Sequence, residues 1–189
     1  MPERLHAYLS GGMEYAKGEG VEWRIDLEAW LGSALGHTAF NPNKESRAIL
    51  ECELPGRDFR KLKFDDIGEY VRVMRLIVER DVREIARRTD YVVCLWDKAA
   101  QAGAGTKGEL SVARYFGKPV YLVTAMSMPE IPGWILGCAT RTLPSFGSLK
   151  SFLRKSYGRG GSRTGSGDNG GRRVKKSLHF DSPRRTRGR

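Results

Sequence analysis

The sequence predicts an α/β fold, with a doubly wound (Rossmann- or flavodoxin-like) sheet of about five mainly parallel strands and a disordered basic C-terminal tail. Short apolar runs alternate with segments of helical periodicity, as in βα units. The run "YVVCLW" at residues 91–96 is continuously apolar, which is typical of a buried parallel strand. We therefore expect one α/β domain over residues 1–155, followed by a tail over residues 156–189.

The first half of the chain predicts two strands and one helix. Residues 4–9 form the first strand, which "SGG" ends, and residues 38–40 form a short second strand. Residues 22–35 form a helix, which Gly36 ends. Its apolar residues recur every three to four positions: Trp23, Leu27, Trp30, Leu31 and Leu35. The polar stretch over residues 41–65 is expected to be irregular, as in an active-site flap or a partner surface.

The second half predicts two further strands, an edge strand and three helices. Asp65 or Asp66 is expected to cap a long helix. The apolar face of this helix comprises Val71, Met74, Ile77, Val78, Val82 and Ile85. Strands over 91–96 and 119–124 flank a helix over 106–116. The stretch "SMPEIPGWILGCAT" is expected to hold a turn and an edge strand, before a last helix over 148–155.

The tail carries most of the positive charge. The chain has a net charge of +11, and residues 156–189 contribute +8 of it through ten Lys and Arg against two Asp. This segment is also rich in Gly and Ser and poor in apolar residues, so it cannot bury enough surface to offset its ordering entropy. Such a tail binds nucleic acid through its charge or merely solubilises the chain, and both interpretations remain open.

The composition argues against several classes of protein. No apolar run approaches the roughly 18 residues of a membrane span, and the N-terminus lacks the apolar core of a signal peptide, so we expect a cytoplasmic protein without membrane contact. The three cysteines form no C-x-x-C pair, and the three histidines are scattered. We therefore expect neither a disulfide framework nor a metal, and no cofactor.

The candidate ligand site follows from the predicted sheet, because ligands bind beyond the carboxyl ends of parallel strands. Tyr8 and the turn Ser10, Gly11 and Gly12 end the first strand, and Asp97 with "AGAGTKGE" follows the central strand. Backbone N–H groups in such turns can hold a phosphate or carboxylate. The alternative interpretation is that these glycines only permit tight turns.

Glu109 has two interpretations. Thr106 and Glu109 have the spacing of a capping box, in which the Thr hydroxyl and the Glu carboxylate satisfy N–H groups at a helix start. A capping box does not, however, require the three glycines that lie within residues 103–108. A reactive carboxylate in a ligand-binding turn is the alternative.

Five segments together resemble the nucleoside 2-deoxyribosyltransferase family and its relatives that hydrolyse nucleotide N-glycosidic bonds. They are "HAYLSGGME", "GVEWRIDLEAWL", "FNP", "ERDVREIARRTDYVVCLWD" and "GAGTKGELSVARYFGKPVYLV", within residues 4–124. The most specific element is the Gly-Thr-x-x-Glu turn, followed by Gly-Lys-Pro.

The resemblance implies roles for particular residues. Glu109 corresponds to the nucleophile that attacks C1′ of the sugar, Tyr8 to the tyrosine that orients it, and Asp81 to a carboxylate that faces the substrate. Ser10, Gly11 and Gly12 correspond to one substrate-binding turn, and Gly105 and Thr106 to the other.

The resemblance also leaves points open. Family members often carry a base-contacting aspartate where this chain has Gly103, so Asp97 is the alternative base contact. The implied activity is that of a transferase or hydrolase acting on a nucleoside or nucleotide, in a homo-oligomer. The alternative is a nucleotide-binding or sensing module without catalysis, associated with nucleic acid through its basic tail.

Overall fold

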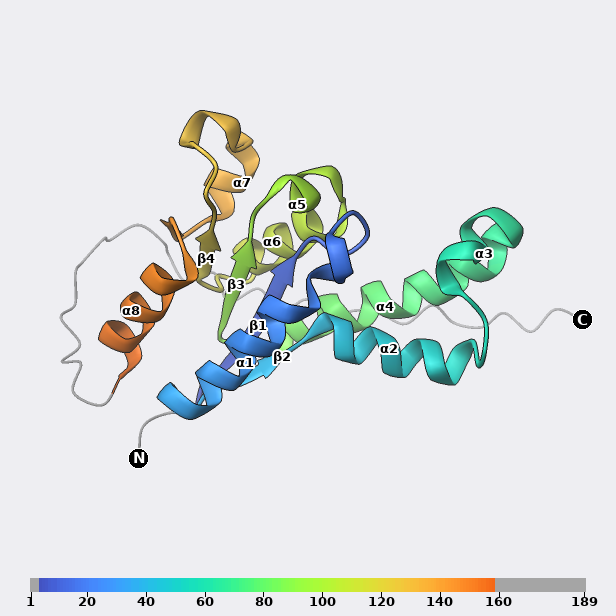
Figure 1. Ribbon diagram of the computed structural model, residues 1–189, viewed down its shortest axis with the longest axis horizontal. Coiled ribbons are helices and arrows are strands. Elements are labelled where there is room, and N and C mark those ends of the chain that lie inside the picture. Colours follow the sequence, from blue (N-terminus) through green and yellow to red (C-terminus); the bar gives the residue numbers. More distant parts are fainter. Residues whose placement is uncertain (1–3, 159–189) are drawn as a thin grey trace, which may run out of the picture.

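The computed structural model describes residues 4–158, which contain a five-stranded sheet flanked by helices (Figure 1). The strands are β1 His6–Gly11, β2 Thr38–Phe40, β3 Tyr91–Leu95, β4 Val120–Val123 and β5 Arg141–Leu143. They are arranged in the order β2-β1-β3-β4-β5, and every neighbouring pair is parallel. The α/β prediction is therefore confirmed, and the direction of the winding reverses between β1 and β3.

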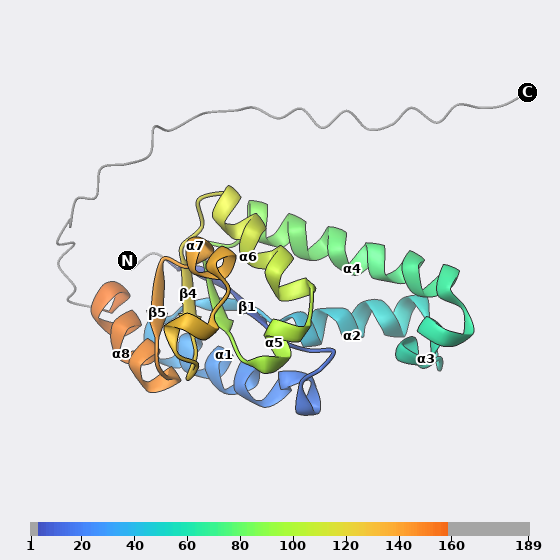
Figure 2. The same ribbon diagram turned by 90° about the horizontal axis from the view of Figure 1, so that it is seen from above.

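Helices cover both faces of the sheet (Figure 2). On one side lie α1 Val21–Leu35 and α8 Phe146–Tyr157, and on the other lie α4 Ile67–Arg87 and α6 Gly105–Tyr115. The remaining elements are α2 Pro42–Glu53, α3 Phe59–Asp65, α5 Lys98–Ala102, α7 Gly133–Cys138 and the 3₁₀ turns η1 Lys17–Gly20 and η2 Met128–Glu130.

The alternation of side chains along the strands divides the interior into two cores. On β1, Tyr8 belongs to the core beneath α4 and α6, whereas Ala7 and Leu9 belong to the core beneath α1 and α8. The same alternation places Val92 and Val93 of β3 in opposite cores. Side chains two positions apart on a strand point to the same face of the sheet, so Tyr8 and Ser10 share one face.

The stretch 41–65 is not irregular, so this prediction was wrong. Asn41 caps α2 by accepting a hydrogen bond from Asn43 N, and Asp58 caps α3. Together with the start of α4 these helices form an arm that extends beyond the sheet in both views (Figures 1 and 2). The arm has its own small core around Leu54, Leu62 and Val73. The many charges of the segment obscured this apolar pattern.

Two further predictions need correction near the C-terminus. The segment 127–140 contains η2 and α7, and the edge strand β5 begins only at Arg141. The last helix, α8, spans Phe146–Tyr157 and is longer at both ends than the expected helix over 148–155. The rest of the predicted tail, residues 159–189, lies outside the described residues.

Of the two residues predicted to cap the long helix α4, Asp66 is the cap. Its side chain accepts a hydrogen bond from Glu69 N.

Of the helices within residues 4–158, none combines the length and the apolar character needed to cross a lipid bilayer.

Candidate active site

The carboxylate of Glu109 receives hydrogen bonds from two hydroxyl groups of β1. Tyr8 Oη donates to Glu109 Oε1 at 3.0 Å, and Ser10 Oγ donates to Glu109 Oε2 at 2.5 Å. Tyr8 and Ser10 are fully buried, and Glu109 is half-buried. Both carboxylate oxygens are therefore fixed in one orientation at the carboxyl edge of the sheet, where parallel folds bind ligands.

The sheet dictates this arrangement. Because side chains alternate along a strand, Tyr8 and Ser10 point to the same face of β1, toward α6. Glu109 lies in the first turns of α6, the second helix after β3, which packs against β1. The parallel pairing of β1 with β3 then brings residues about a hundred positions apart into contact.

Glu109 does not form the capping box that its spacing with Thr106 suggests. The residue that caps α6 is Ala104, and α6 has no side-chain cap. Thr106 is already inside the helix and is buried. Because the Glu109 carboxylate is bound by Tyr8 and Ser10, it is not available to the helix start. The structural interpretation of Glu109 as a helix cap is therefore wrong.

Burial raises the pKa of Glu109 to about 7. The loss of hydration is the largest cause, and the negative charge of Asp81 adds to it. The hydrogen bonds from Ser10 and Tyr8 and the positive charge of Arg24 act in the opposite direction. A buried carboxyl group with a pKa near neutral at the carboxyl edge of a parallel sheet is a feature common in active sites.

Asp81 extends the acidic part of this site from α4. It is buried, and its partner is the neighbouring Arg80, whose Nη2 lies 2.6 Å from Asp81 Oδ1. Burial raises the pKa of Asp81, whereas Arg80 and the hydroxyl of Tyr8 lower it. Asp81 is thus a component of the Glu109 site and not a solvated helix charge.

Arg24 of α1 is a fully buried cation next to the site. It donates from Nε to Leu9 O at 3.1 Å and from Nη2 to Gly11 O at 2.8 Å. Its Nη1 donates to Glu19 O and Gly20 O. Arg24 therefore joins the end of β1 to the turn that follows it, and it places a positive charge near the Glu109 carboxylate.

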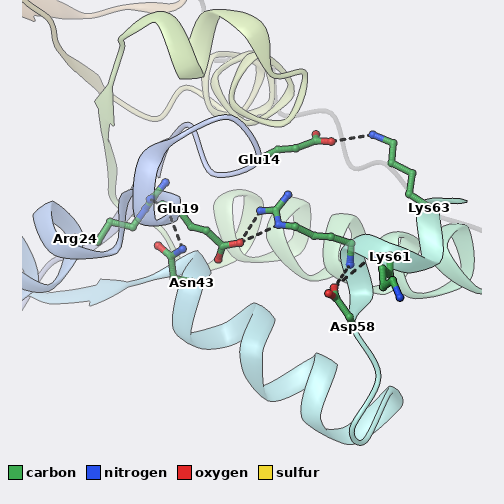
Figure 3. A network of polar contacts seen from close by, with 8 residues as sticks. Glu14, Glu19, Arg24, Asn43, Asp58, Lys61 and Lys63 are labelled. Carbon is green, nitrogen blue, oxygen red and sulfur yellow. Dashed lines mark hydrogen bonds and ion pairs between the residues drawn. The ribbon is translucent and has the colours of Figure 1, made fainter.

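Figure 3 shows how that turn is attached to the helical arm. Glu19 adopts a left-handed conformation, with φ of 55°, which is uncommon for a residue other than glycine. Its carbonyl accepts from Arg24 and from Asn43 Nδ2 of α2, and its carboxylate accepts from Arg60 of α3. These contacts hold Glu19 in a strained conformation between three elements.

The other predicted site residues lie around the same edge of the sheet. Gly11 ends β1, and Gly12 packs so closely against α5 that a Cβ atom would come within 2.7 Å of Ala100 N. Asp97 caps α5 by accepting from Ala100 N at 2.8 Å. Gly105 is the first residue of α6.

Asp97 therefore has a structural partner already, and Gly103 ends α5 in an extended conformation. The ring of Tyr15, an exposed residue of the β1–α1 turn, lies beside Gly103.

No group of three His, Cys, Asp or Glu side chains suited to a metal ion occurs in the part of the chain that the structure describes.

Sequence reasoning missed three residues of this site: Arg24, Phe40 and Arg80. Arg24 did carry a signal, because it precedes Leu27 by three residues and Leu31 by seven and so lies on their buried face. Phe40 stacks on Tyr8, with ring centroids 5.2 Å apart. Nothing in the sequence pointed to Arg80, because its partner Asp81 is the next residue and adjacent side chains on a helix do not ordinarily face each other.

In comparisons with known proteins, no protein-family model matches this chain, and no curated protein is similar enough to count as a match.

Proposed function

We propose that this protein cleaves the N-glycosidic bond of a nucleoside or nucleotide, with Glu109 as the nucleophile. The observation that supports the proposal best is the Glu109 carboxylate itself. It is held by Tyr8 and Ser10 at the carboxyl edge of the sheet, and its pKa is raised to about 7. The residues also resemble those of the nucleoside 2-deoxyribosyltransferase family, with the Gly-Thr-x-x-Glu turn as the most specific element.

The proposed reaction proceeds in two steps. An oxygen of ionised Glu109 attacks C1′ of the sugar, the C1′–N bond breaks, and the base leaves with the electron pair and takes a proton from solvent. Water or a second base then attacks C1′, and the ester bond to Glu109 breaks. The first acceptor gives hydrolysis, and the second gives transfer of the sugar.

The neighbours of Glu109 suit this chemistry. Tyr8 and Ser10 orient the carboxylate, which favours attack because a fixed geometry replaces a search through rotamers. Buried Arg24 favours the ionised form of Glu109, and Asp81 adds negative charge near a sugar that becomes positive in the transition state. A substrate of this class also accords with the expected cytoplasmic location.

The test is base release from a panel of nucleosides and nucleotides, followed by chromatography. We expect Glu109→Gln to release base at least about a hundredfold more slowly, because an amide is a poor nucleophile, and to form no covalent sugar adduct in mass spectrometry. Glu79→Gln, on an exposed part of α4, is the matched control and should keep the wild-type rate. Near-normal turnover by Glu109→Gln would refute the nucleophile. A wild-type protein that binds nucleotides but releases no base would favour a sensing module.

We also propose that the protein is a homo-oligomer. The outer face of α4 exposes four apolar residues, Ile67, Val71, Val78 and Val82. The intervals between them are four, seven and four residues, so the pattern reads the same from either end of the helix. An antiparallel second copy would therefore place Ile67 opposite Val82 and Val71 opposite Val78, as a two-fold interface requires. Exposed apolar stripes of this kind commonly mark protein interfaces.

A further inference from the structure

Arg80 and Asp81 form an ion pair although they are neighbours on α4. Arg80 donates to Asp81 Oδ1 from Nε at 2.9 Å and from Nη2 at 2.6 Å. Adjacent helical side chains point about 100° apart, so this contact requires the Arg80 side chain to fold back along the helix. Both side chains are largely buried, with 18% and 12% of their surfaces exposed.

Two other elements hold Arg80 in this position. Its Nη2 also donates to Ser46 Oγ of α2 at 3.1 Å. Its guanidinium lies over the ring of Phe40 at the end of β2, 5.3 Å from the ring centroid. Phe40 in turn stacks on Tyr8, which donates to Glu109. A continuous series of contacts therefore runs from Arg80 to the proposed nucleophile.

Both donors of Arg80 bind the same oxygen of Asp81, Oδ1, and leave Oδ2 to other partners. We propose that Arg80 is a positioning residue for the proposed N-glycosidic activity: it holds the Asp81 side chain in one rotamer through Oδ1, with Oδ2 directed to a hydroxyl of the sugar. This inference rests on the proposed function. Arg80 does not touch the substrate in this proposal and acts only through Asp81.

The charges around Asp81 explain why Arg80 matters. The groups that act on it are Tyr8 from β1, Glu45 from α2, Glu109 from α6 and Arg80 on α4 itself. Arg80 is the cation of this set. Burial and Glu45 raise the pKa of Asp81, and Arg80 is the largest influence that lowers it. Loss of the cation should therefore leave Asp81 protonated at higher pH.

The experiment compares Arg80→Gln and Arg80→Lys with the wild type. Arg83→Gln is the matched control, because Arg83 is exposed on the same helix and forms no ion pair within residues 4–158. Carbon-13 NMR of the side-chain carboxyl groups gives the titration of Asp81, and base release over a range of pH gives the rate.

In Arg80→Gln we expect Asp81 to titrate about one pH unit or more above the wild type. The rate of base release should fall, because a carboxyl group that is protonated or free to change rotamer no longer holds the sugar hydroxyl. Arg80→Lys should restore the titration but leave kcat roughly tenfold low, because an ammonium group cannot make the two-donor contact. In an Asp81→Asn background, Arg80→Gln should change the rate by less than about twofold.

An unchanged Asp81 titration in folded Arg80→Gln would overturn the proposal, and so would a shifted titration with a wild-type rate of base release. If Arg80→Gln does not fold, Arg80→Met takes its place, since its aliphatic chain still covers Phe40. If the wild type releases no base from any substrate, the proposed function fails, and the positioning of a sugar fails with it. The NMR titration would still decide whether Arg80 keeps Asp81 ionised.

Discussion

Tyr8 and Glu109 are 101 residues apart in the chain, and the Tyr8 hydroxyl donates a hydrogen bond to the Glu109 carboxylate at 3.0 Å. Tyr8 is fully buried and its pKa is raised, mainly by burial, so it remains a neutral donor. The contact connects the first strand to α6, the second helix after the central strand. It also makes the orientation and the pKa of the Glu109 carboxyl group depend on Tyr8, whose ring is part of the core.

Tyr8→Phe should slow base release about tenfold or more. The ring still stacks on Phe40, so the fold is kept, but one of the two hydroxyl donors to Glu109 is lost. Because that hydrogen bond lowers the pKa of Glu109, its loss should move the acidic limb of the pH–rate profile to higher pH. Tyr70→Phe, at a ring that stacks on Phe59, is the control. An unchanged rate and profile would assign Tyr8 to the core alone.

Glu109→Gln should be more stable than the wild type above pH 7. The folded-state pKa of Glu109 is about 7, above its ordinary value of 4.5, so the native state retains a proton that the unfolded chain releases. As pH rises from about 4.5 to 7 the wild type therefore loses stability, on the order of 3 kcal/mol for a pKa that is raised from 4.5 to about 7. A glutamine pays no such penalty, and its amide can keep both hydroxyl contacts.

Chemical denaturation at pH 4 and pH 8 measures this difference. The gain of Glu109→Gln over the wild type should be small at pH 4 and larger at pH 8, whereas exposed Glu79→Gln should show no such trend. A gain that is equal at both pH values would mean that Glu109 is not desolvated in the native state.

Truncation after Lys155 should destabilise the domain, by about 2 kcal/mol. It removes Tyr157, whose hydroxyl lies 2.5 Å from that of Tyr121 and whose ring stacks on Tyr91 at 5.6 Å. Loss of a half-buried aromatic side chain leaves a gap in the core beneath α8. Truncation after Gly158 keeps these contacts and is the matched control. If both truncations melt alike, Tyr157 contributes nothing measurable to the domain.

Val78→Asp should convert the proposed oligomer to a monomer. Val78 is half-exposed, at 52%, so the substitution should change the stability of a single chain by less than about 0.5 kcal/mol. A charge in the apolar stripe of α4 would, however, be desolvated in an interface. Sedimentation velocity at several concentrations measures the change, with Arg83→Gln as the control. A wild-type protein that sediments as a monomer at all concentrations would refute the proposal.

The sheet was predictable because its signals are local. The apolar run over residues 91–96 and the strand that ends at "SGG" are short-range features of the chain, so the order of the elements alone indicated which turns meet. The binding partners of Glu109 were not predictable from local spacing. Its distance from Thr106 matches a capping box, and only tertiary packing decides between that partner and Tyr8.

The helices α2 and α3 were missed for a different reason. Their apolar residues are few and are buried against α4 and not against the sheet, so the segment looks like a charged loop. The ion pair of Arg80 with Asp81 was also out of reach. It depends on a side chain that folds back between Ser46 and Phe40, which no periodicity describes.

Arg24 binds the end of β1 and the turn that follows it through main-chain carbonyl groups, those of Leu9, Gly11, Glu19 and Gly20. Carbonyl groups are common to all amino acids, so Arg24 imposes a path on the backbone without specifying side chains. Substitutions at residues 13–17 can therefore alter what the turn presents to a ligand while its course stays fixed. Variation in evolution, and libraries designed to change selectivity, should be tolerated at these five positions and rejected at Arg24.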